Sequence, residues 1–279
     1  MNIEIKGLGK KFEINKREHI ALENVNLTIK KGEFVCILGP SGCGKSTLLN
    51  VLAGLEIPSE GSITFDGKSS KEVGPERAIV FQDGALFPWL NVIDNVKFGM
   101  KIKNISEEEA NEKAMKYLKM VHLTNFANSS ISELSGGMRQ RVSIARALTL
   151  DSNLILMDEP FSALDAQTKT LLQTEIQKIW YETGKTFVFI THNIEEAVML
   201  ADRVIVMGTR PGKVKKEFPI ELGRPRTQGS SDVSYMVKRI FDVIKEEVEK
   251  VAKAEYDNDW SLEKDEILFD SDNNLGINL

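Results

Sequence analysis

Two kinds of periodicity follow each other along the chain. Residues 3–29 alternate apolar and polar positions and carry turn signals, which predicts paired β-strands. After them, short apolar runs typical of buried strands alternate with segments of helical apolar spacing. The predicted strands cover residues 33–38, 62–66, 78–82, 154–157, 186–190 and 203–207, and the predicted helices cover residues 47–53, 106–120, 166–181 and 195–200. This order predicts a largely parallel sheet with helices on both faces, preceded by an antiparallel β part.

A helical block interrupts this alternation at about residues 95–150. Within it, Ser106 precedes three glutamates and then apolar residues at helical spacing. This is typical of a helix N-terminus, because the serine oxygen accepts from free backbone N–H groups and the acidic turn complements the helix dipole. We expect the block to form a helical subdomain within a main domain at residues 1–230.

The C-terminal part, residues 231–279, has a different pattern. Residues 232–255 carry apolar side chains at helical spacing, which predicts an amphipathic helix. The remaining segment is acidic and rich in asparagine, with scattered apolar side chains such as Trp260 and Phe269. This composition favours a solvated tail, and a regulatory or partner-binding role is the open alternative.

Composition limits the classes of protein to consider. A chain of 279 residues with 42% apolar residues can bury the core of a large α/β domain. The formal net charge of -5 gives no indication of a nucleic-acid partner. Only two cysteines occur, so we expect a reducing compartment and no disulfide framework. We expect a soluble protein, because the sequence has neither a signal-peptide pattern nor an apolar stretch of membrane-span length.

Residues 39–47 read GPSGCGKST and match the pattern G-x-x-x-x-G-K-[ST] of a phosphate-binding loop. Glycines let several backbone N–H groups converge on a triphosphate, because they lack a Cβ atom and adopt positive φ angles without strain. The predicted strand before the loop and a helix opening at Lys45 give it the required context. The predicted ATP contacts are Gly39, Pro40, Ser41, Gly42, Cys43, Gly44, Lys45, Ser46 and Thr47.

Three side chains of this loop, which we call the cradle, have specific expected roles. Lys45 is expected to reach the β- and γ-phosphates as a point charge, and the Ser46 hydroxyl to ligate Mg²⁺, which prefers oxygen. The thiol of Cys43 is expected to line the site. Because Lys45 and a helix N-terminus both favour the thiolate, we expect a bulky thiol reagent to react there.

A second constellation follows the apolar run at residues 154–157, where the chain reads Asp158, Glu159 and Pro160. Two carboxylates at a strand end can simply cap a turn, but together with an upstream cradle they favour phosphoryl-transfer chemistry. Asp158 is expected near Mg²⁺, and Glu159 is expected to polarise a water aimed at the γ-phosphate.

These motifs and four further segments resemble the nucleotide-binding subunit of an ATP-binding cassette (ABC) transporter over about residues 3–220. The further segments are Gln82, LSGGM at residues 134–138, SALD at residues 162–165 and His192 after a predicted strand. The resemblance implies an α/β fold: a P-loop NTPase cassette with a mainly parallel central sheet, an N-terminal antiparallel β part and an inserted helical subdomain. It also implies hydrolysis of ATP with Mg²⁺ by a homodimer or a heterodimer.

The LSGGM segment, which we call the signature, has its implied role in the dimer. Ser135, Gly136 and Gly137 of one subunit are expected to contact the γ-phosphate bound by Lys45 of the partner subunit. A Ser-Gly-Gly segment before a helix opening at Met138 can act as an anion-binding N-terminus. An ordinary serine cap is the alternative, but two glycines there indicate close approach to the backbone.

The resemblance also implies roles for four isolated residues. Gln82 is expected to contact Mg²⁺ or its water and to sense the membrane partner. His192 is expected to hold the γ-phosphate and the attacking water, and Asp165 to couple the two sites across the dimer. Phe12 lies where an aromatic side chain packs on adenine, although a phenylalanine in a β region is more often a core residue.

Variant details narrow the resemblance to the ATPases of the nitrate, sulfonate, taurine and bicarbonate importer family. The details are Met138 in place of the more usual glutamine, FPWLNVIDNV at residues 87–96, RPG at residues 210–212 and GRPR at residues 223–226. The apolar residues 85–89 suit a groove that receives a short helix of a permease.

This family implies partners outside the chain. They are transmembrane permease subunits and, through the assembled complex, an extracytoplasmic solute-binding protein, with the ATPase placed peripherally on the cytoplasmic face of the membrane. The alternative is a soluble, non-transport ABC module. The short helical block and the single cassette favour transport, whereas the solute leaves no trace in this sequence.

Overall fold

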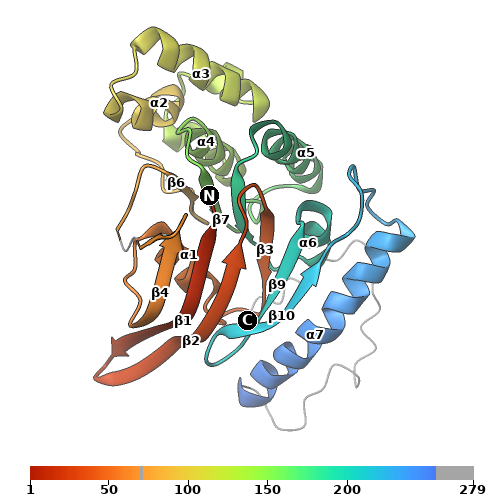
Figure 1. The fold of residues 1–279 in the computed structure, drawn as a ribbon. Coiled ribbons are helices and arrows are strands. Elements are labelled where there is room, and N and C mark those ends of the chain that lie inside the picture. The colour runs from red at the N-terminus through yellow and green to blue at the C-terminus, as the bar shows by residue number, and fades with distance from the viewer. Residues whose placement is uncertain (70–71, 256–279) are drawn as a thin grey trace.

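The computed structural model describes residues 1–69 and 72–255 (Figure 1). The expected acidic tail lies outside this part of the chain. Among the described residues, no helix combines the length and the apolar character that crossing a membrane requires.

The central sheet has six strands in the order β10-β9-β3-β8-β7-β6. The strands are β10 (Lys213–Pro219), β9 (Arg203–Gly208), β3 (Phe34–Leu38), β8 (Thr186–Ile190), β7 (Leu154–Asp158) and β6 (Arg77–Val80). Five of them run parallel, and the edge strand β10 pairs with β9 in the antiparallel direction. We did not predict β10, because its residues are mostly charged and Phe218 is its one fully buried side chain.

The N-terminal residues form a second sheet in the order β2-β1-β4-β5. It consists of β1 (Ile3–Ile14), β2 (Arg17–Ile29), β4 (Glu60–Phe65) and β5 (Lys68–Ser69), and all its pairings are antiparallel. Asn15 and Lys16 join β1 to β2 with positive φ angles of 52° and 62°, as a two-residue hairpin turn requires. The alternation at residues 3–29 therefore indicated the correct structure.

The central sheet separates two hydrophobic cores. In β3, Phe34, Cys36 and Leu38 face one core, while Val35 and Ile37 face the other. The first core is shared with α4 (Gly136–Leu148), α5 (Ala166–Thr183), α6 (Ile194–Leu200) and α7 (Ser231–Glu255). The second lies under α1 (Lys45–Ala53) and the antiparallel sheet. Strands buried on both faces explain why these segments read as continuous apolar runs.

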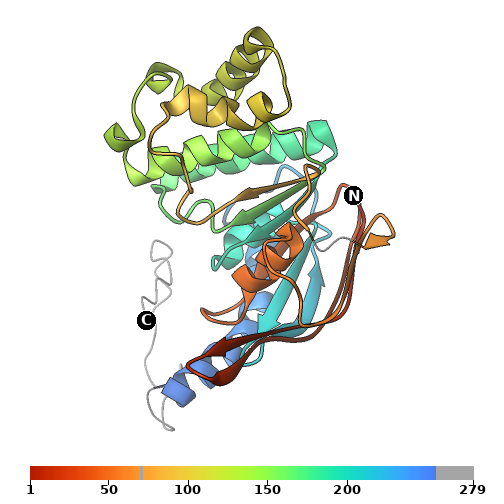
Figure 2. The same cartoon turned by 90° about the vertical axis from the view of Figure 1, so that its left-hand side faces the viewer.

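A helical block lies at one end of the molecule, as Figures 1 and 2 show. It contains α2 (Val92–Ile102), α3 (Glu107–Met120), two 3₁₀ turns (Thr124–Phe126 and Ile131–Glu133) and α4. The Ser106 side chain accepts from the Glu109 N–H group at 3.3 Å, so the expected cap of α3 is confirmed. Helix α4 begins at Gly136, two residues before the predicted start, because Ser135 is its N-cap.

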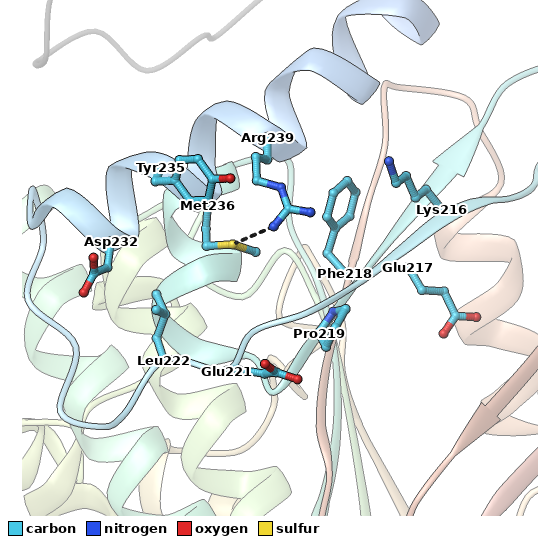
Figure 3. Close-up of a pocket in the computed structure, with 10 residues that line it drawn as sticks. All are labelled: Lys216, Glu217, Phe218, Pro219, Glu221, Leu222, Asp232, Tyr235, Met236 and Arg239. Atoms are coloured by element: carbon cyan, nitrogen blue, oxygen red, sulfur yellow. Dashed lines mark hydrogen bonds between the residues drawn. The ribbon is translucent and has the colours of Figure 1, made fainter.

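Helix α7 packs on α6 and β9 at the other end of the molecule (Figures 1 and 2). Its buried apolar residues Val233, Met236 and Ile240 follow the predicted helical spacing. Figure 3 shows Tyr235, Met236 and Arg239 of α7 facing Phe218 of β10, across a hollow of about 320 Å³. The amphipathic helix is therefore an integral part of the domain surface.

Candidate active site

The carboxyl ends of four parallel strands bring most of the predicted site residues together. β3, β8, β7 and β6 are consecutive neighbours in the sheet, and Asp158 pairs directly with Ile190. The cradle follows β3, and His192 follows β8. Asp158 ends β7, Glu159 comes directly after it, and Gln82 follows β6. Since parallel strands end at the same edge of a sheet, segments more than 100 residues apart converge there.

The backbone of the cradle is shaped for close approach. Gly44 has a φ angle of 87°, and a Cβ atom there would lie 2.7 Å from Leu22 Cδ2 and 2.8 Å from the Ala21 carbonyl oxygen. Only glycine fits this position, since both the φ angle and the space exclude a side chain. Helix α1 begins at the next residue, so its free N–H groups open toward the loop.

Lys45 is turned into the cradle. Its Nζ atom donates to the carbonyl oxygens of Gly39 at 2.7 Å and Pro40 at 2.9 Å, and the residue is 8% exposed. These acceptors are neutral. A phosphate can replace them, because hydrogen bonds between ionised groups are stronger than those to neutral carbonyls.

The Ser46 hydroxyl hydrogen-bonds to the Asp158 carboxylate, close enough to Lys45 for its charge to act on that carboxylate. Burial raises the pKa of Asp158, while the Ser46 hydroxyl and the Lys45 ammonium act in the opposite direction. A half-buried carboxylate next to a hydroxyl is a donor set that fits Mg²⁺, which prefers hard oxygen ligands. That these two residues bind Mg²⁺ remains a prediction.

Glu159 and His192 form a contact across the ends of β7 and β8. His192 Nδ1 lies 3.0 Å from Glu159 Oε2, and the hydrogen bond lowers the pKa of Glu159 and raises the pKa of His192. The Glu159 N–H group donates to the Ile190 carbonyl oxygen at 3.0 Å. Glu159 also has a φ angle of 43°, an unfavourable value for a glutamate. The carboxylate is thus held ionised and in a fixed place, as a group that polarises water requires.

Gln82 and Phe12 occupy more exposed positions. The strand β6 ends at Val80, two residues earlier than predicted, so Gln82 stands in an exposed turn beyond it. Phe12 lies on β1 opposite His19, and Lys10 Nζ is 4.8 Å from the centre of its ring. Phe12 is half-exposed and belongs to neither hydrophobic core. The core alternative for this phenylalanine is therefore wrong, and the Lys10 ammonium lies over its ring.

The signature forms a separate surface. Ser135 caps α4 by accepting from the Met138 N–H group at 3.2 Å. A hollow of about 390 Å³ is lined by Ser135, Gly136, Gly137, Met138, Arg141, Ala163, Leu164, Asp165 and Thr168, and it includes no cradle residue. Asp165 caps α5 by accepting from the Thr168 N–H group at 3.0 Å, which lowers its pKa. In the described chain the hollow at the signature is therefore separate from the cradle.

The expectation that the thiol of Cys43 lines the site is wrong. Cys43 is 0% exposed and packs into the second core with residues of β1, β3 and α1. A Cβ atom at Gly39 would lie 2.6 Å from its Sγ atom, so the thiol points under the loop. Burial raises the pKa of Cys43 and outweighs the nearby ammonium of Lys45. The Cys43 side chain therefore contributes nothing to the exposed surface of the cradle.

Two residues of α4 that were not predicted from the sequence hold the segment around Gln82. Gln140 is buried and donates to the Phe81 carbonyl oxygen at 3.1 Å. Arg146 donates to the carbonyl oxygens of Gly84 at 3.0 Å and Ala85 at 2.9 Å. Gln140 stands on the same stripe of α4 as the buried Ile144 and Ala147, so a polar residue on an apolar face was the available signal.

Comparisons with known proteins agree with this geometry. The family model described as ABC transporter matches residues 22–162. An uncharacterized ABC transporter ATP-binding protein of Methanocaldococcus jannaschii is 46% identical over 253 residues, which cover 91% of this chain and 95% of that protein. The taurine import ATP-binding protein TauB of Pelagibacter ubique is 49% identical over 208 residues, which cover 74% of this chain and 78% of TauB.

Solved structures give the same result. A dimeric ATP-binding cassette in a post-hydrolysis state, bound to ADP and Pi, is similar with a TM-score of 0.73 and 36% identity over 79% of this chain and 100% of that chain. A second dimeric ABC transporter cassette has a TM-score of 0.74 and 37% identity at the same coverage. The chain therefore belongs to the ABC transporter family and is an ATP-binding subunit that hydrolyses ATP.

Proposed function

We propose that two copies of this ATPase close face to face on two ATP molecules, with the signature of each copy completing the site on the other. The observation that carries the proposal is the separation of the cradle from the hollow at Ser135. A γ-phosphate held by Lys45 leaves one side open, and the uncharged N-terminus of α4 offers backbone N–H groups for it. The dimeric state of the similar solved cassettes supports this arrangement.

Within such a site, each residue of this chain has one task. Lys45 binds the β- and γ-phosphates, Glu159 takes or polarises the proton of the attacking water, and His192 orients Glu159 and the γ-phosphate. Ser46, Asp158 and Gln82 would hold Mg²⁺, which neutralises phosphate charge when bound. Phe12 is the proposed platform for adenine, since its half-exposed ring lies outside the core.

We propose that ATP hydrolysis drives the import of a small solute of the nitrate, sulfonate, taurine or bicarbonate class. Support comes from the relatives named as taurine import proteins and from the variant motifs of the sequence. The partners would be transmembrane permease subunits at the cytoplasmic face of the membrane and a solute-binding protein on the other side. The loop at residues 85–89 would receive the permease, because Trp89 is 75% exposed there while α4 holds the backbone behind it.

Reconstitution tests this proposal. The ATPase is combined in proteoliposomes with the permease encoded beside it and the matching solute-binding protein, and a panel of anions is offered. We expect one solute to stimulate ATP hydrolysis and to accumulate inside. A protein that hydrolyses ATP at the same rate with and without the permease, for every solute, would contradict the importer and favour the soluble module.

A further inference from the structure

A buried carboxylate on α7 has no part in the chemistry described above. Glu247 is 2% exposed, although it lies in a helix with a charged outer face. One of its oxygens, Oε2, accepts from the Thr209 N–H group at 2.9 Å and from the Thr209 hydroxyl at 3.2 Å. The other, Oε1, accepts from Lys215 at 2.7 Å and Lys250 at 2.7 Å. A buried carboxylate that accepts from these donors keeps the donor groups in fixed positions.

Glu247 bonds to the turn between β9 and β10. Thr209 opens this turn, and Gly208 before it lies so close that a Cβ atom there would be 3.3 Å from Glu247 Oε2. Lys215 belongs to β10 on the far side of the turn. The carboxylate therefore bonds both to the start of the turn and to the strand β10 that follows it.

The other end of the same turn touches the cradle. A Cβ atom at Gly212 would lie 2.2 Å from the Cys43 carbonyl oxygen and 2.8 Å from the Ala21 carbonyl oxygen. Gly212 also donates to the Ala21 carbonyl at 3.1 Å and accepts from the Glu23 N–H group at 2.9 Å. The turn is thus packed, backbone against backbone, between the cradle and β2.

The strand that leads into the turn adds a second contact. The Met207 carbonyl oxygen would lie 3.0 Å from a Cβ atom at Gly39, the first residue of the cradle. Residues 207–212 therefore support the cradle at both Gly39 and Cys43. Such packing leaves the cradle little freedom to relax before nucleotide arrives.

We propose that Glu247 is a positioning residue for nucleotide binding: by fixing residues 209–212 against the backbone of Cys43, helix α7 keeps the cradle in the shape that binds Mg-ATP. A site that is already ordered does not have to be ordered at the cost of binding free energy. Because coupling between two sites is reciprocal, bound nucleotide in turn stabilises the contact of Glu247 with Thr209. The inference rests on the assignment of residues 39–47 as the nucleotide cradle.

The chain offers a matched control for the test. Glu246 pairs with the same Lys215 at 2.6 Å, but its side chain is 65% exposed and no hydrogen bond to Thr209 is among its contacts in the described structure. Glu247→Ala and Glu246→Ala therefore each remove one glutamate from Lys215, and only the first releases the turn. Glu247→Gln keeps an oxygen acceptor for Thr209 and serves as the conservative variant.

Equilibrium binding of a non-hydrolysable Mg-ATP analogue to the full-length variants is measured together with thermal unfolding without nucleotide. We expect Glu247→Ala to bind at least about fivefold more weakly, Glu246→Ala to bind within about twofold of the wild type, and Glu247→Gln to recover most of the affinity. A folded Glu247→Ala protein with wild-type affinity, or an equal loss in Glu246→Ala, would overturn the proposal. A lower unfolding temperature with unchanged affinity would show a structural role alone.

Hydrogen exchange of the wild type gives a readout that needs no substitution. The Mg-ATP analogue should slow exchange of the Thr209 amide by at least about fivefold, and an unchanged rate would contradict the linkage. The same binding assay on Lys45→Ala distinguishes a failure of the cradle assignment from a failure of the role proposed for Glu247. If Lys45→Ala binds as well as the wild type, the cradle assignment fails; if it does not bind and Glu247→Ala does so normally, only the role of Glu247 fails.

Discussion

His192 Nδ1 lies 3.0 Å from Glu159 Oε2, which joins the ends of the adjacent strands β7 and β8. The contact raises the pKa of His192 and lowers the pKa of Glu159. Glu159 is also held by its backbone bond to Ile190 at an unfavourable φ angle of 43°. Two residues 33 positions apart are thus fixed as one unit, with the carboxylate ionised and the imidazole oriented by it.

This contact predicts a pH dependence. The raised pKa of His192 means that its contact with Glu159 stabilises the fold fully at pH values below 6.5, the ordinary pKa of histidine. This stabilisation is lost as the pH rises through the raised pKa. The lowered pKa of Glu159 means that the contact stabilises the fold fully at pH values above 4.5, the ordinary pKa of glutamate. This stabilisation is lost as the pH falls through the lowered pKa. The contact therefore contributes most between pH 4.5 and 6.5.

NMR titration of the His192 ring tests this pH dependence by measuring the pKa of the imidazole. In the wild type we expect a midpoint above pH 6.5, and in Glu159→Gln a midpoint closer to 6.5, because the neutral amide no longer favours the imidazolium. The ring spectra of His19 and His122 should be the same in both proteins and report an intact fold. An identical midpoint for His192 in the two proteins would mean that the contact is absent in solution.

Lys45→Ala should reduce the affinity for Mg-ATP by at least about 100-fold. Without nucleotide the Lys45 ammonium bonds to the carbonyl oxygens of Gly39 and Pro40, and we expect it to bond to phosphate oxygens when ATP is bound. The substitution removes this cation. Calorimetric titration measures the loss. Lys6→Ala, which removes an exposed lysine paired with Glu4, is the control and should bind normally. Full ATPase activity of Lys45→Ala would remove the cradle assignment.

Cys43 should resist bulky thiol reagents in the native protein at neutral pH. Its thiol is 0% exposed, and burial raises its pKa, so the reactive thiolate is a minor species until the pH is well above neutral. Mass spectrometry of labelled Cys36→Ser protein isolates this site. Labelling should require denaturant, and rapid labelling of the native protein that Mg-ATP blocks would restore the original expectation.

The cases of Cys43 and His192 show what the sequence can and cannot reveal. Lys45 and Glu159 lie in motifs that can be read from the residues, and the role of His192 was implied by the resemblance to the ABC family. The three lie close together because each follows a strand of a parallel sheet, and such strands end at one edge. The direction of the Cys43 thiol depends instead on its packing against residues of other strands, which no local pattern encodes.

Glu247 illustrates the same limit at longer range. It stands among glutamates and lysines of an amphipathic helix, so its burial depends on contacts with residues far away in the sequence, such as Thr209, 38 residues earlier. Strand β10 was missed for a related reason, because an exposed edge strand with charged residues does not show the apolar alternation of a strand.

Met138→Gln should leave ATPase activity within about twofold of the wild type. The Met138 backbone N–H group bonds to Ser135, and its side chain packs partly on the first core, so no anion contact is lost. Replacing these apolar contacts by an amide should cost about 1 kcal/mol of stability. Steady-state kinetics and thermal unfolding measure both effects. A loss of activity as large as that of Ser135→Arg would assign Met138 a role in the chemistry.

The central claim is that ATP is enclosed between two copies of this chain and that Glu159 activates the water. Glu159→Gln keeps the size of the side chain and removes its charge, whereas Lys45, Ser46 and Asp158 still bind Mg-ATP. Hydrolysis should therefore slow by orders of magnitude while the ATP-bound dimer persists. Ser135→Arg in the same background should block closure, because it places a bulky cation at the capped end of α4.

Light scattering coupled to size exclusion, with and without Mg-ATP, decides the matter. We predict that Mg-ATP shifts Glu159→Gln from monomer to dimer with two ATP molecules retained, and that the double variant Glu159→Gln, Ser135→Arg stays monomeric. A Glu159→Gln protein that hydrolyses ATP at the wild-type rate, or a double variant that dimerises equally well, would contradict the composite site.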